Sequence, residues 1–197
     1  MAKLYFRYGA MNSGKTTAIL QAAFNYEERD MRVLIVKPSV DTKGGDTIVS
    51  RIGASRNVDV VATDNTNLFE VVKQNSQEEQ GLACVLVDES QFLTEAQVDQ
   101  LFTVTVTLNI PVICYGLRGD FQTKAFSGSA RLFELAHSIE ELKTICRCGK
   151  KAILNGRKVN GQFVSNGLQV AIDGEDSVEY ESLCGNCYLK LVGPVGR

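Results

Sequence analysis

The sequence predicts an α/β fold in which a parallel sheet is sandwiched by helices, and three features point to it. Short runs that are apolar on both faces alternate with helical stretches, which is typical of parallel strands buried between helices. A glycine-rich loop directly follows the first apolar run. The alternation stops near Ile145, where turn signals replace helical periodicity, so a small C-terminal β module is expected after the α/β part.

Four strands and four helices are expected before that point. The strands are expected at Lys3–Tyr8, Met31–Lys37, Ala83–Asp88 and Pro111–Gly116. The helices are expected at Lys15–Arg29, Asn67–Gln77, Thr94–Leu108 and Ala130–Ala136. Thr94 is a capping residue with Gln97 three positions later, which supports the start of the third helix. The polar, glycine-bearing segment Ser39–Ser55 is predicted to be a loop.

The chain is predicted to divide into two domains and a tail. Residues 1–144 form the nucleotide-binding α/β domain, residues 145–192 the small β module, and residues 193–197 a short mobile tail. Turn signals in the module stand at Asn155-Gly156, Asn160-Gly161, Asn166-Gly167 and Asp173-Gly174.

Composition excludes several classes of protein. The chain is 44% hydrophobic and 22% charged, which is ordinary for a globular protein. A net charge of −2 offers no electrostatic footprint for nucleic acid. No window has the length and apolarity of a membrane span, and the first strand begins too early for a signal peptide, so we expect a cytoplasmic protein with no membrane partner. Cys84 and Cys114 lie in apolar runs and are expected to be buried free thiols.

Residues 9–16 read Gly-Ala-Met-Asn-Ser-Gly-Lys-Thr, a complete G-x-x-x-x-G-K-[ST] phosphate loop between a strand and a helix. Gly9 and Gly14 let the backbone turn tightly, and its N–H groups with the positive end of the following helix attract an anion. Lys15 is expected to reach the β- and γ-phosphates, and Thr16 to ligate Mg²⁺. The chain is therefore predicted to bind a nucleoside triphosphate in a P-loop NTPase (RecA-like) fold.

Two carboxylates, Asp88 and Glu89, end the apolar run Val85-Leu86-Val87. Such a strand ends beside the phosphate loop at the carboxyl edge of the sheet, where Asp88 would hold Mg²⁺ directly or through its water shell. Glu89 would polarise water in an ATPase or accept the proton of an attacking hydroxyl in a kinase. The absence of an Asn-Lys-x-Asp motif argues against a small GTPase.

Four cysteines form two close pairs, Cys146 with Cys148 and Cys184 with Cys187. Each pair sits in a turn with glycine, a pattern typical of a tetrahedral Cys₄ zinc site; such a closed site is structural rather than catalytic. The 35 residues between the pairs exceed the roughly 15–20 of an ordinary zinc ribbon. We therefore predict a zinc ribbon that carries a long loop, and loops of this length commonly capture substrate.

Three phenylalanines, Phe92, Phe121 and Phe126, fall at or beyond strand ends, and Arg118 and Lys124 accompany them. Such rings could stack on a nucleobase, and the cations could screen phosphate charge in a transition state. Ordinary packing within loops is the alternative for any single ring.

Taken together, these motifs resemble the type II thymidine kinases, a family of cytosolic, zinc-bearing P-loop enzymes. The resemblance covers nearly the whole chain in the motif order of the family: the phosphate loop, Asp88-Glu89-Ser90-Gln91-Phe92, Gly116-Leu117 through Phe126, and the paired cysteines. It implies transfer of the γ-phosphate of ATP to the 5′-hydroxyl of thymidine, which gives dTMP in pyrimidine salvage for DNA synthesis. It also implies a homotetramer inhibited by dTTP.

The resemblance further implies roles for individual residues. The catalytic residues would be Glu89 as base, Lys15 as phosphate clamp and Arg118, with Lys124 also near the reacting phosphate. The ATP-binding residues would be Gly9, Ala10, Met11, Asn12, Ser13, Gly14, Lys15, Thr16, Asp88, Glu89, Ser90 and Gln91, with Thr16 and Asp88 on Mg²⁺. The thymidine-binding residues would be Phe92, Leu117, Phe121, Phe126, Val170, Ala171, Ile172, Asp173, Gly174 and Tyr180.

In the family, a loop called the lasso extends from the zinc module and covers the nucleoside. Val170–Gly174 resembles the strip that reads the base through backbone groups, and Asp41-Thr42-Lys43 resembles a loop on the triphosphate side. The connection Gly174–Tyr180 is slightly longer than the usual one, and the Cys146-x-Cys148 spacing is a variant.

Two other functions stay open at this point. One is a P-loop ATPase whose zinc ribbon binds nucleic acid, although the acidic balance of the chain counts against it. The other is a kinase for a different nucleoside, such as deoxyuridine or deoxycytidine, because recognition through backbone groups leaves little trace in a sequence.

Overall fold

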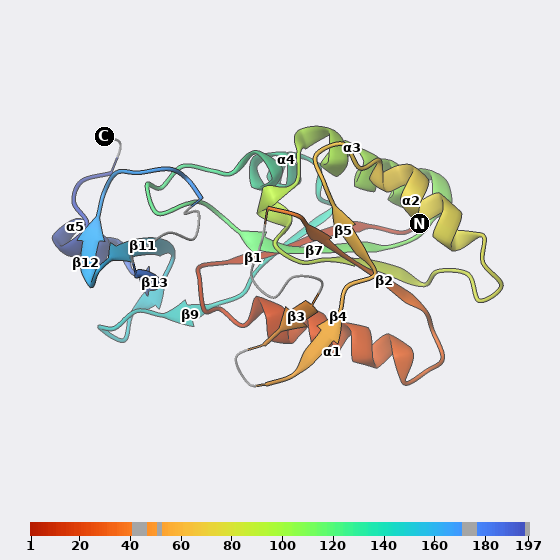
Figure 1. Cartoon of the computed structure of the whole chain (residues 1–197), viewed down its shortest axis with the longest axis horizontal. Helices are drawn as coiled ribbons and strands as arrows, with labels where there is room; N and C mark the ends of the chain where they lie inside the picture. The colour runs from red at the N-terminus through yellow and green to blue at the C-terminus, as the bar shows by residue number, and fades with distance from the viewer. Residues whose placement is uncertain (41–46, 51–52, 171–176, 196–197) are drawn as a thin grey trace.

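A six-stranded parallel sheet forms the centre of the larger part of the molecule (Figure 1). The computed structural model describes residues 1–40, 47–50, 53–170 and 177–195. The strand order is β5-β2-β6-β7-β1-β8, and every neighbouring pair is parallel. The strands span Leu4–Gly9 (β1), Val33–Pro38 (β2), Val60–Ala62 (β5), Cys84–Val87 (β6), Val112–Leu117 (β7) and Ser138–Glu141 (β8).

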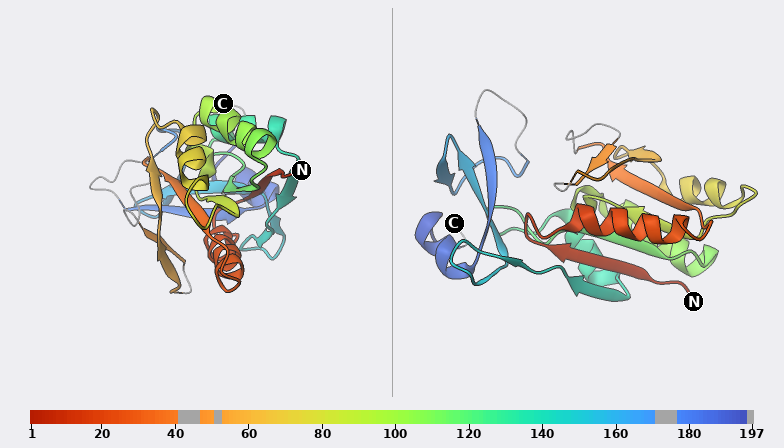
Figure 2. Two further views of the ribbon diagram at one scale, coloured as in Figure 1. Left: turned by 90° about the vertical axis from the view of Figure 1, so that its right-hand side faces the viewer. Right: turned by 90° about the horizontal axis from the view of Figure 1, so that it is seen from below.

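Helices cover both faces of this sheet, as Figures 1 and 2 show. Helix α1 (Lys15–Glu27) lies on one face together with the hairpin of β3 (Thr47–Val49) and β4 (Ser55–Asn57). Three helices lie on the other face: α2 (Leu68–Ser76), α3 (Glu95–Thr103) and α4 (Ser127–Leu135). The predicted α/β fold, a parallel sheet sandwiched by helices, is confirmed.

The core is divided by the sheet into two apolar layers. Side chains alternate along β2 and β6, since successive residues of a strand point to opposite faces. One set packs under α2, α3 and α4: Leu34, Val36, Val85, Val87, Leu68, Val72, Val98, Leu101 and Leu132. The other set packs under α1: Val33, Ile35, Cys84, Leu86, Ile19 and Ala23. Burial on both faces explains why these strands read as continuous apolar runs.

The third helix follows its predicted course with one change. The cap is reciprocal, because Thr94 Oγ1 accepts from Gln97 N at 3.2 Å while Gln97 Oε1 accepts from Thr94 N at 3.1 Å. Regular α-helix ends at Thr103, and a wider π-helical turn continues over Val104–Leu108. This last turn is rich in β-branched residues, and Thr107 Oγ1 donates to Thr103 O at 2.8 Å, a contact that competes with the regular ladder.

Several local expectations are wrong at the edges of the domain. Strands β5 and β8 were not expected, because edge strands are short and only partly buried and so lack a long apolar run. The segment Ser39–Ser55 is not all loop, since Thr47–Val49 pairs with Ser55–Asn57. The fourth helix begins at Ser127, earlier than predicted. Gly128 lies in its first turn, where a Cβ would come within 2.6 Å of Leu93 O, so this glycine allows close packing.

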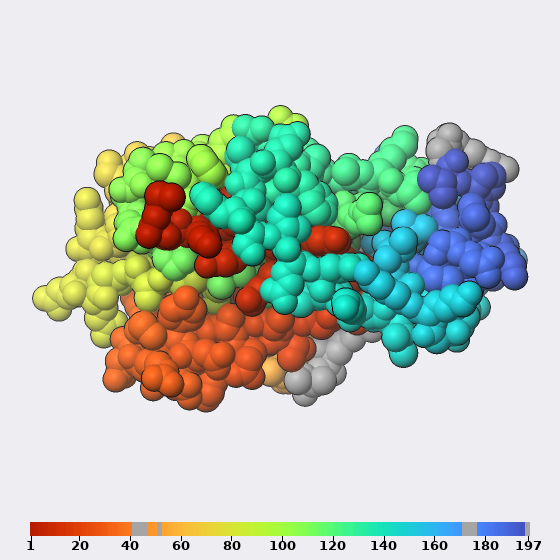
Figure 3. All heavy atoms as spheres, turned by 180° about the vertical axis from the view of Figure 1, so that it is seen from behind, coloured from red at the N-terminus to blue at the C-terminus, as the bar shows by residue number. Residues whose placement is uncertain are grey.

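The small module contains a three-stranded antiparallel sheet of β11 (Leu154–Val159), β12 (Gln162–Val164) and β13 (Val178–Leu183). A short pair, β9 (Thr144–Ile145) and β10 (Lys151–Ala152), connects it to the larger sheet. Helix α5 (Gly185–Leu191), which the sequence did not indicate, closes the module. The module lies at one end of the molecule, as the space-filling view from behind shows (Figure 3).

The structure confirms some of the turns predicted in the module but not all of them. Asn160 and Gly161 form the predicted two-residue hairpin turn, with φ of 50° and 81°. Asn155-Gly156 is not a turn but part of β11; a Cβ at Gly156 would come within 2.7 Å of the Phe163 ring, so the glycine is required by packing. Asn166-Gly167 forms a bend, and Asp173-Gly174 lies outside the described residues.

Within the described ranges, no helix is both long and apolar enough to cross a membrane.

The burial of the two side chains predicts that truncating Phe6 lowers the free energy of unfolding much more than truncating Phe24 does. The Phe6 ring on β1 is fully buried and packs edge-on against Phe133 with ring centroids 5.0 Å apart. Phe6→Ala should lower the free energy of unfolding by ~3–5 kcal/mol because it leaves a cavity. Phe24 on α1 is 59% exposed, so Phe24→Ala should change it by less than ~0.5 kcal/mol. Urea unfolding followed by circular dichroism measures both, and equal losses would contradict this description of the core.

Candidate functional site

Three loops that carry the predicted site residues meet at one edge of the large sheet. Strand β7 lies between β6 and β1, and all three run in the same direction. The phosphate loop (residues 9–16) follows β1, the acidic segment 88–92 follows β6, and the aromatic loop 118–126 follows β7. Because carboxyl ends of parallel strands share an edge, the structure brings these predicted residues together.

The phosphate loop favours glycine at two positions, for two different reasons. Gly14 caps α1 with φ of 79°, in the left-handed region. A Cβ on Gly9 would lie 2.3 Å from Ser13 Oγ and 2.7 Å from Leu142 O. Lys15 is 6% exposed, and its Nζ donates to Ala10 O at 3.0 Å within the same loop. The loop therefore surrounds a cation at the N-terminus of a helix, an arrangement suited to phosphate.

Glu89 is held in an unusual backbone conformation beside this loop. Its φ of 47° lies in the left-handed region, which is costly for a residue with a side chain. Its N–H donates to Asp88 Oδ1 at 3.0 Å, and its Oε2 accepts from Gln91 Nε2 at 2.6 Å. Gln91 Oε1 in turn accepts from Leu117 N at 3.0 Å. One amide thus fixes the direction of the Glu89 carboxylate relative to the end of β7.

Ser90 and Gln91, both predicted to bind ATP, use their side chains inside the protein. They are 0% and 1% exposed. Ser90 Oγ donates to Tyr115 O at 2.9 Å, and a Cβ on Gly116 would come within 2.6 Å of Ser90 Oγ. This close approach explains the glycine before Leu117. Any contact of these two residues with a nucleotide stays a prediction.

The predicted aromatic residues form two groups. Phe92 and Phe126 pack edge to face with ring centroids 5.5 Å apart, close to the end of β7. Phe121 is 1% exposed, and the guanidinium carbon of Arg157 lies 3.7 Å from its ring centroid. One face of Phe121 is therefore covered by Arg157, and the rest of the ring is buried as well, so stacking of a base on Phe121 stays a prediction. The predicted cations Arg118 and Lys124 are both exposed on this loop.

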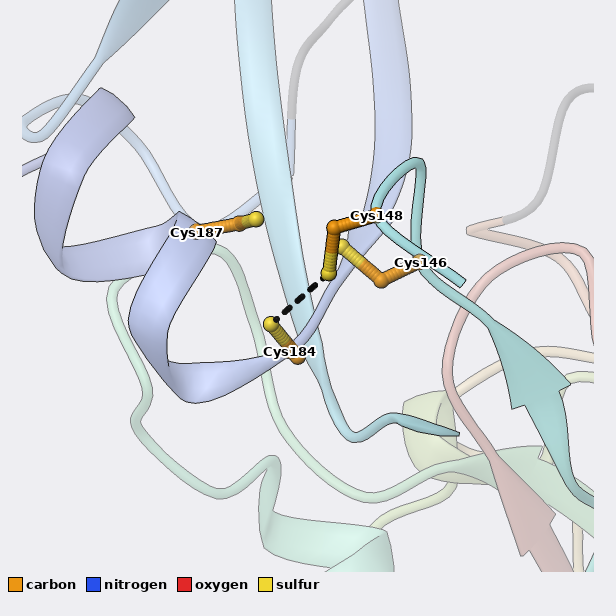
Figure 4. A group of neighbouring side chains, drawn as sticks. All are labelled: Cys146, Cys148, Cys184 and Cys187. Atoms are coloured by element: carbon orange, nitrogen blue, oxygen red, sulfur yellow. Dashed lines mark hydrogen bonds between the residues drawn. The ribbon is translucent and has the colours of Figure 1, made fainter. Parts of the chain in front are cut away.

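The four paired cysteines converge on one point, as predicted. Their sulfur atoms all lie within 4.8 Å of one another, and Cys148 Sγ lies 3.6 Å from Cys184 Sγ (Figure 4). One pair comes from the turn between β9 and β10, the other from the start of α5. A tetrahedral zinc ion with Zn–S bonds of ~2.3 Å requires sulfur atoms about 3.8 Å apart. The cluster could hold zinc with little adjustment.

The protonation of these thiols also favours a cation. Burial opposes ionisation of Cys146, but backbone hydrogen bonds from Cys148 and Cys184 lower its pKa to about 6. A backbone hydrogen bond from Cys187 lowers the pKa of Cys184, whereas hydrogen bonds with the other thiols, first with Cys148, raise the pKa of Cys187 to about 12. Four sulfur atoms this close cannot all be thiolates unless a positive charge neutralises them. A divalent soft-ligand metal such as zinc meets that need.

The module also forms hydrogen bonds with the phosphate loop, through two residues that the sequence did not indicate as part of the site. Asn155 and Ser182 stand opposite each other on β11 and β13. Asn155 Oδ1 accepts from Met11 N at 2.7 Å, and Ser182 Oγ donates to Met11 O. Asn155 Nδ2 donates to Gly119 O at 2.9 Å in the aromatic loop. The module therefore joins the loops that follow β1 and β7.

Arg157 is a third residue that the sequence did not indicate as part of the site. It stands opposite Tyr180 in the register of β11 and β13, and its Nε donates to Tyr180 Oη at 2.9 Å. The only sequence signal is the spacing of two from Asn155, which puts both side chains on one face of a strand. This spacing was not interpreted as a strand face, because the Asn155-Gly156 dipeptide is typical of a turn.

The predicted lasso strip is described only in part. Val170 lies in a bend and is partly buried. Ala171, Ile172, Asp173 and Gly174 lie outside the described residues, as do Asp41, Thr42 and Lys43. Tyr180, at the far end of the connection, lies in β13 with its hydroxyl on Arg157.

Comparison with known proteins gives a consistent result over the whole chain. A family model described as "Thymidine kinase" matches residues 2–188. A "Thymidine kinase" of Haemophilus influenzae is 45% identical over 197 residues, covering 99% of this chain and 100% of that protein. Proteins of the same name from Mannheimia succiniciproducens and Shewanella oneidensis are each 47% identical. They cover 93% and 98% of this chain, and 93% and 99% of their own lengths.

The cysteine cluster predicts loss of metal when one of its ligands is replaced. Cys184→Ser should reduce bound zinc from about one ion per chain to well below that, because tetrahedral sites need all four donors. Amide exchange within residues 145–192 should become faster while the parallel sheet keeps its protection. Metal analysis and hydrogen exchange with mass spectrometry measure the two effects.

Cys84→Ala is the matched control, because Cys84 is a buried thiol on β6 outside the cluster. It should keep its zinc. A full zinc equivalent in the Cys184→Ser protein would show that the cluster is not a metal site.

Proposed function

The chain belongs to the thymidine kinase family, and from this premise we propose that it transfers the γ-phosphate of ATP to the 5′-hydroxyl of thymidine, giving ADP and dTMP. The observation that supports this reaction most directly is the position of Glu89. Its carboxylate is oriented by Gln91, which also binds the backbone at the end of β7. A fixed carboxylate at the same edge of the sheet as a phosphate loop and an aromatic loop suits removal of a proton from a hydroxyl acceptor.

The donor side of the proposed site is the phosphate loop. Its N–H groups and the N-terminus of α1 would bind the phosphates of ATP, and Lys15 would exchange its contact with Ala10 O for the β- and γ-phosphates. Thr16 and Asp88 would hold Mg²⁺, which when bound neutralises phosphate charge. Asp88 is 4% exposed, and so little water competes for its carboxylate.

The acceptor side is the aromatic loop with the residues that follow β6. Leu117, Phe92, Phe121 and Phe126 would bind thymine, and the backbone of Val170–Gly174 would read its edge. Glu89 would accept the proton of the 5′-hydroxyl, while Arg118 stabilises the charge that develops on the phosphoryl oxygens. Holding the hydroxyl in line with the γ-phosphate contributes ~7–11 kcal/mol in favourable cases.

The finer properties of the family are part of the proposal. They comprise structural zinc on Cys146, Cys148, Cys184 and Cys187, assembly as a homotetramer, inhibition by dTTP, a cytoplasmic location, and the domain bounds 1–144 and 145–192. The zinc proposal is supported by the convergence of the four sulfur atoms.

An assay of ATP-dependent phosphorylation across nucleosides tests the function. Thymidine, deoxyuridine and deoxycytidine are each supplied with ATP and Mg²⁺, and the products are separated by chromatography. We expect dTMP as the preferred product. ATP turnover that responds to DNA but not to any nucleoside would instead identify a nucleic-acid-dependent ATPase.

The role of Glu89 predicts a defect in kcat. Glu89→Gln keeps an oxygen that can accept from Gln91 but cannot take a proton, so kcat should fall by about 10²- to 10⁴-fold. The dissociation constant for ATP should change by less than about threefold, since the phosphate loop is untouched. Steady-state kinetics and calorimetry measure the two. Glu95→Gln, at an exposed position on α3, is the control; if both variants turned over like the wild type, Glu89 would not be the base.

A further inference from the structure

Arg157 is a buried cation whose partners all belong to the acceptor side of the molecule. It is 4% exposed. Among the described residues no carboxylate forms an ion pair with it, and its partners there are two carbonyl oxygens, a tyrosine hydroxyl and aromatic rings. Burying a guanidinium is costly, and each of its hydrogen bonds is therefore strong and directional.

Three hydrogen bonds of Arg157 hold two segments that are distant in the sequence. Nη1 donates to Leu168 O at 2.7 Å and Nη2 to Gln169 O at 2.8 Å. Nε donates to Tyr180 Oη at 2.9 Å. One side chain therefore joins the backbone before Val170 to the tyrosine on β13.

The same guanidinium covers the ring of Phe121. The distance of 3.7 Å between the guanidinium carbon and the ring centroid is that of direct stacking. Phe121 is also held through its backbone, since Tyr188 Oη donates to Phe121 O at 2.6 Å. A Cβ on Gly167 would come within 3.3 Å of Arg157 Nη1, so the neighbouring backbone closes tightly over the stack.

A second set of contacts connects residues 167–169 with the loop that carries Phe121. Gln169 Nε2 donates to Asp120 Oδ2 at 3.1 Å, and Gln122 Nε2 donates to Gly167 O at 3.2 Å. Asp120 is 5% exposed, and its Oδ1 accepts from the backbone of Gln122 and Lys124. The segment 167–169 and the loop that carries Phe121 are therefore joined by two hydrogen bonds, one donated by each segment.

We propose that Arg157 is a positioning residue for the nucleoside acceptor, which rests on the proposed function. It fixes the tilt of the Phe121 ring and holds residues 167–169 and Tyr180 beside that ring before a nucleoside binds. Such preorganisation lowers the cost of ordering on binding. The requirement is for arginine rather than lysine, because only a planar guanidinium can stack on a ring while it donates to three separate acceptors.

Two substitutions test this role. Arg157→Met keeps an unbranched chain without charge, and Arg157→Lys keeps the charge without the planar fork. Arg157→Met should raise the KM and the dissociation constant for thymidine at least about tenfold, and Arg157→Lys by an intermediate factor. The KM for ATP should change less than about threefold, because no contact of Arg157 reaches the phosphate loop. Amide exchange of residues 163–169 should become faster in both variants.

Lys158→Met is the matched control. Lys158 follows Arg157 on β11, points to the opposite face, and places its Nζ 5.1 Å from the centroid of the Phe163 ring. This variant removes a neighbouring cation that also lies over a phenylalanine. It should keep the wild-type KM for thymidine and wild-type exchange at 165–169, the part of the segment beyond its own contact with Phe163.

The outcomes separate this inference from the proposed function. A wild-type protein that does not phosphorylate thymidine would defeat the proposed function, while exchange at 163–169 would still test the contacts of Arg157. Wild-type KM for thymidine in both Arg157 variants would overturn the inference, as would equal rises in KM for thymidine and ATP, which indicate general damage. If Arg157→Met fails to fold, Arg157→Lys and Tyr180→Phe, which removes one acceptor, carry the test.

Discussion

The side chain of Asn155 makes the two hydrogen bonds on which the relative position of the two halves of the site depends. One joins it to Met11 N in the phosphate loop and the other to Gly119 O in the aromatic loop. Ser182 stands opposite Asn155 in the pairing of β11 and β13, and its Oγ donates a hydrogen bond to Met11 O. Asn155 and Ser182 are 4% and 5% exposed, and hydrogen bonds in such a low-dielectric environment are strong and costly to break. The phosphate loop and the aromatic loop are thus held together by the small module.

The cysteine cluster lies in the small core of that module. The core of the module is small, with Cys146, Ala152, Leu183, Cys184 and Tyr188 as its buried residues. A core of this size contributes little stability by itself, which is why small modules commonly depend on a metal. Cys184 lies only two residues after Ser182, so the sulfur cluster is close along the chain to the residue that binds the phosphate loop. A metal ion held by these cysteines would therefore also support the phosphate loop.

Prediction from the sequence succeeded where the signal is local and failed where a distant contact decides. The central strands and the cysteine cluster follow from apolar runs and residue spacing, and the structure confirms them. The edge strands β5 and β8 carry no such run, and Asn155-Gly156 reads as a turn although the Phe163 ring requires glycine in a strand. Glu89 was identified as a candidate base from its motif, but its left-handed backbone and its hydrogen bond to Gln91 were not visible in the sequence.

The sequence by itself determined the phosphate loop, the acidic strand end, the paired cysteines and the alternation of strands and helices, because each depends on residues that are close along the chain. Only the tertiary structure revealed that Arg157 stacks on Phe121 and that Asn155 reaches Met11. The second contact joins residues 144 positions apart, and side chains at such separations meet only when β11 is packed against the edge of the large sheet. Local sequence propensity cannot predict such a contact, because the contact depends on how whole elements pack and not on any single segment.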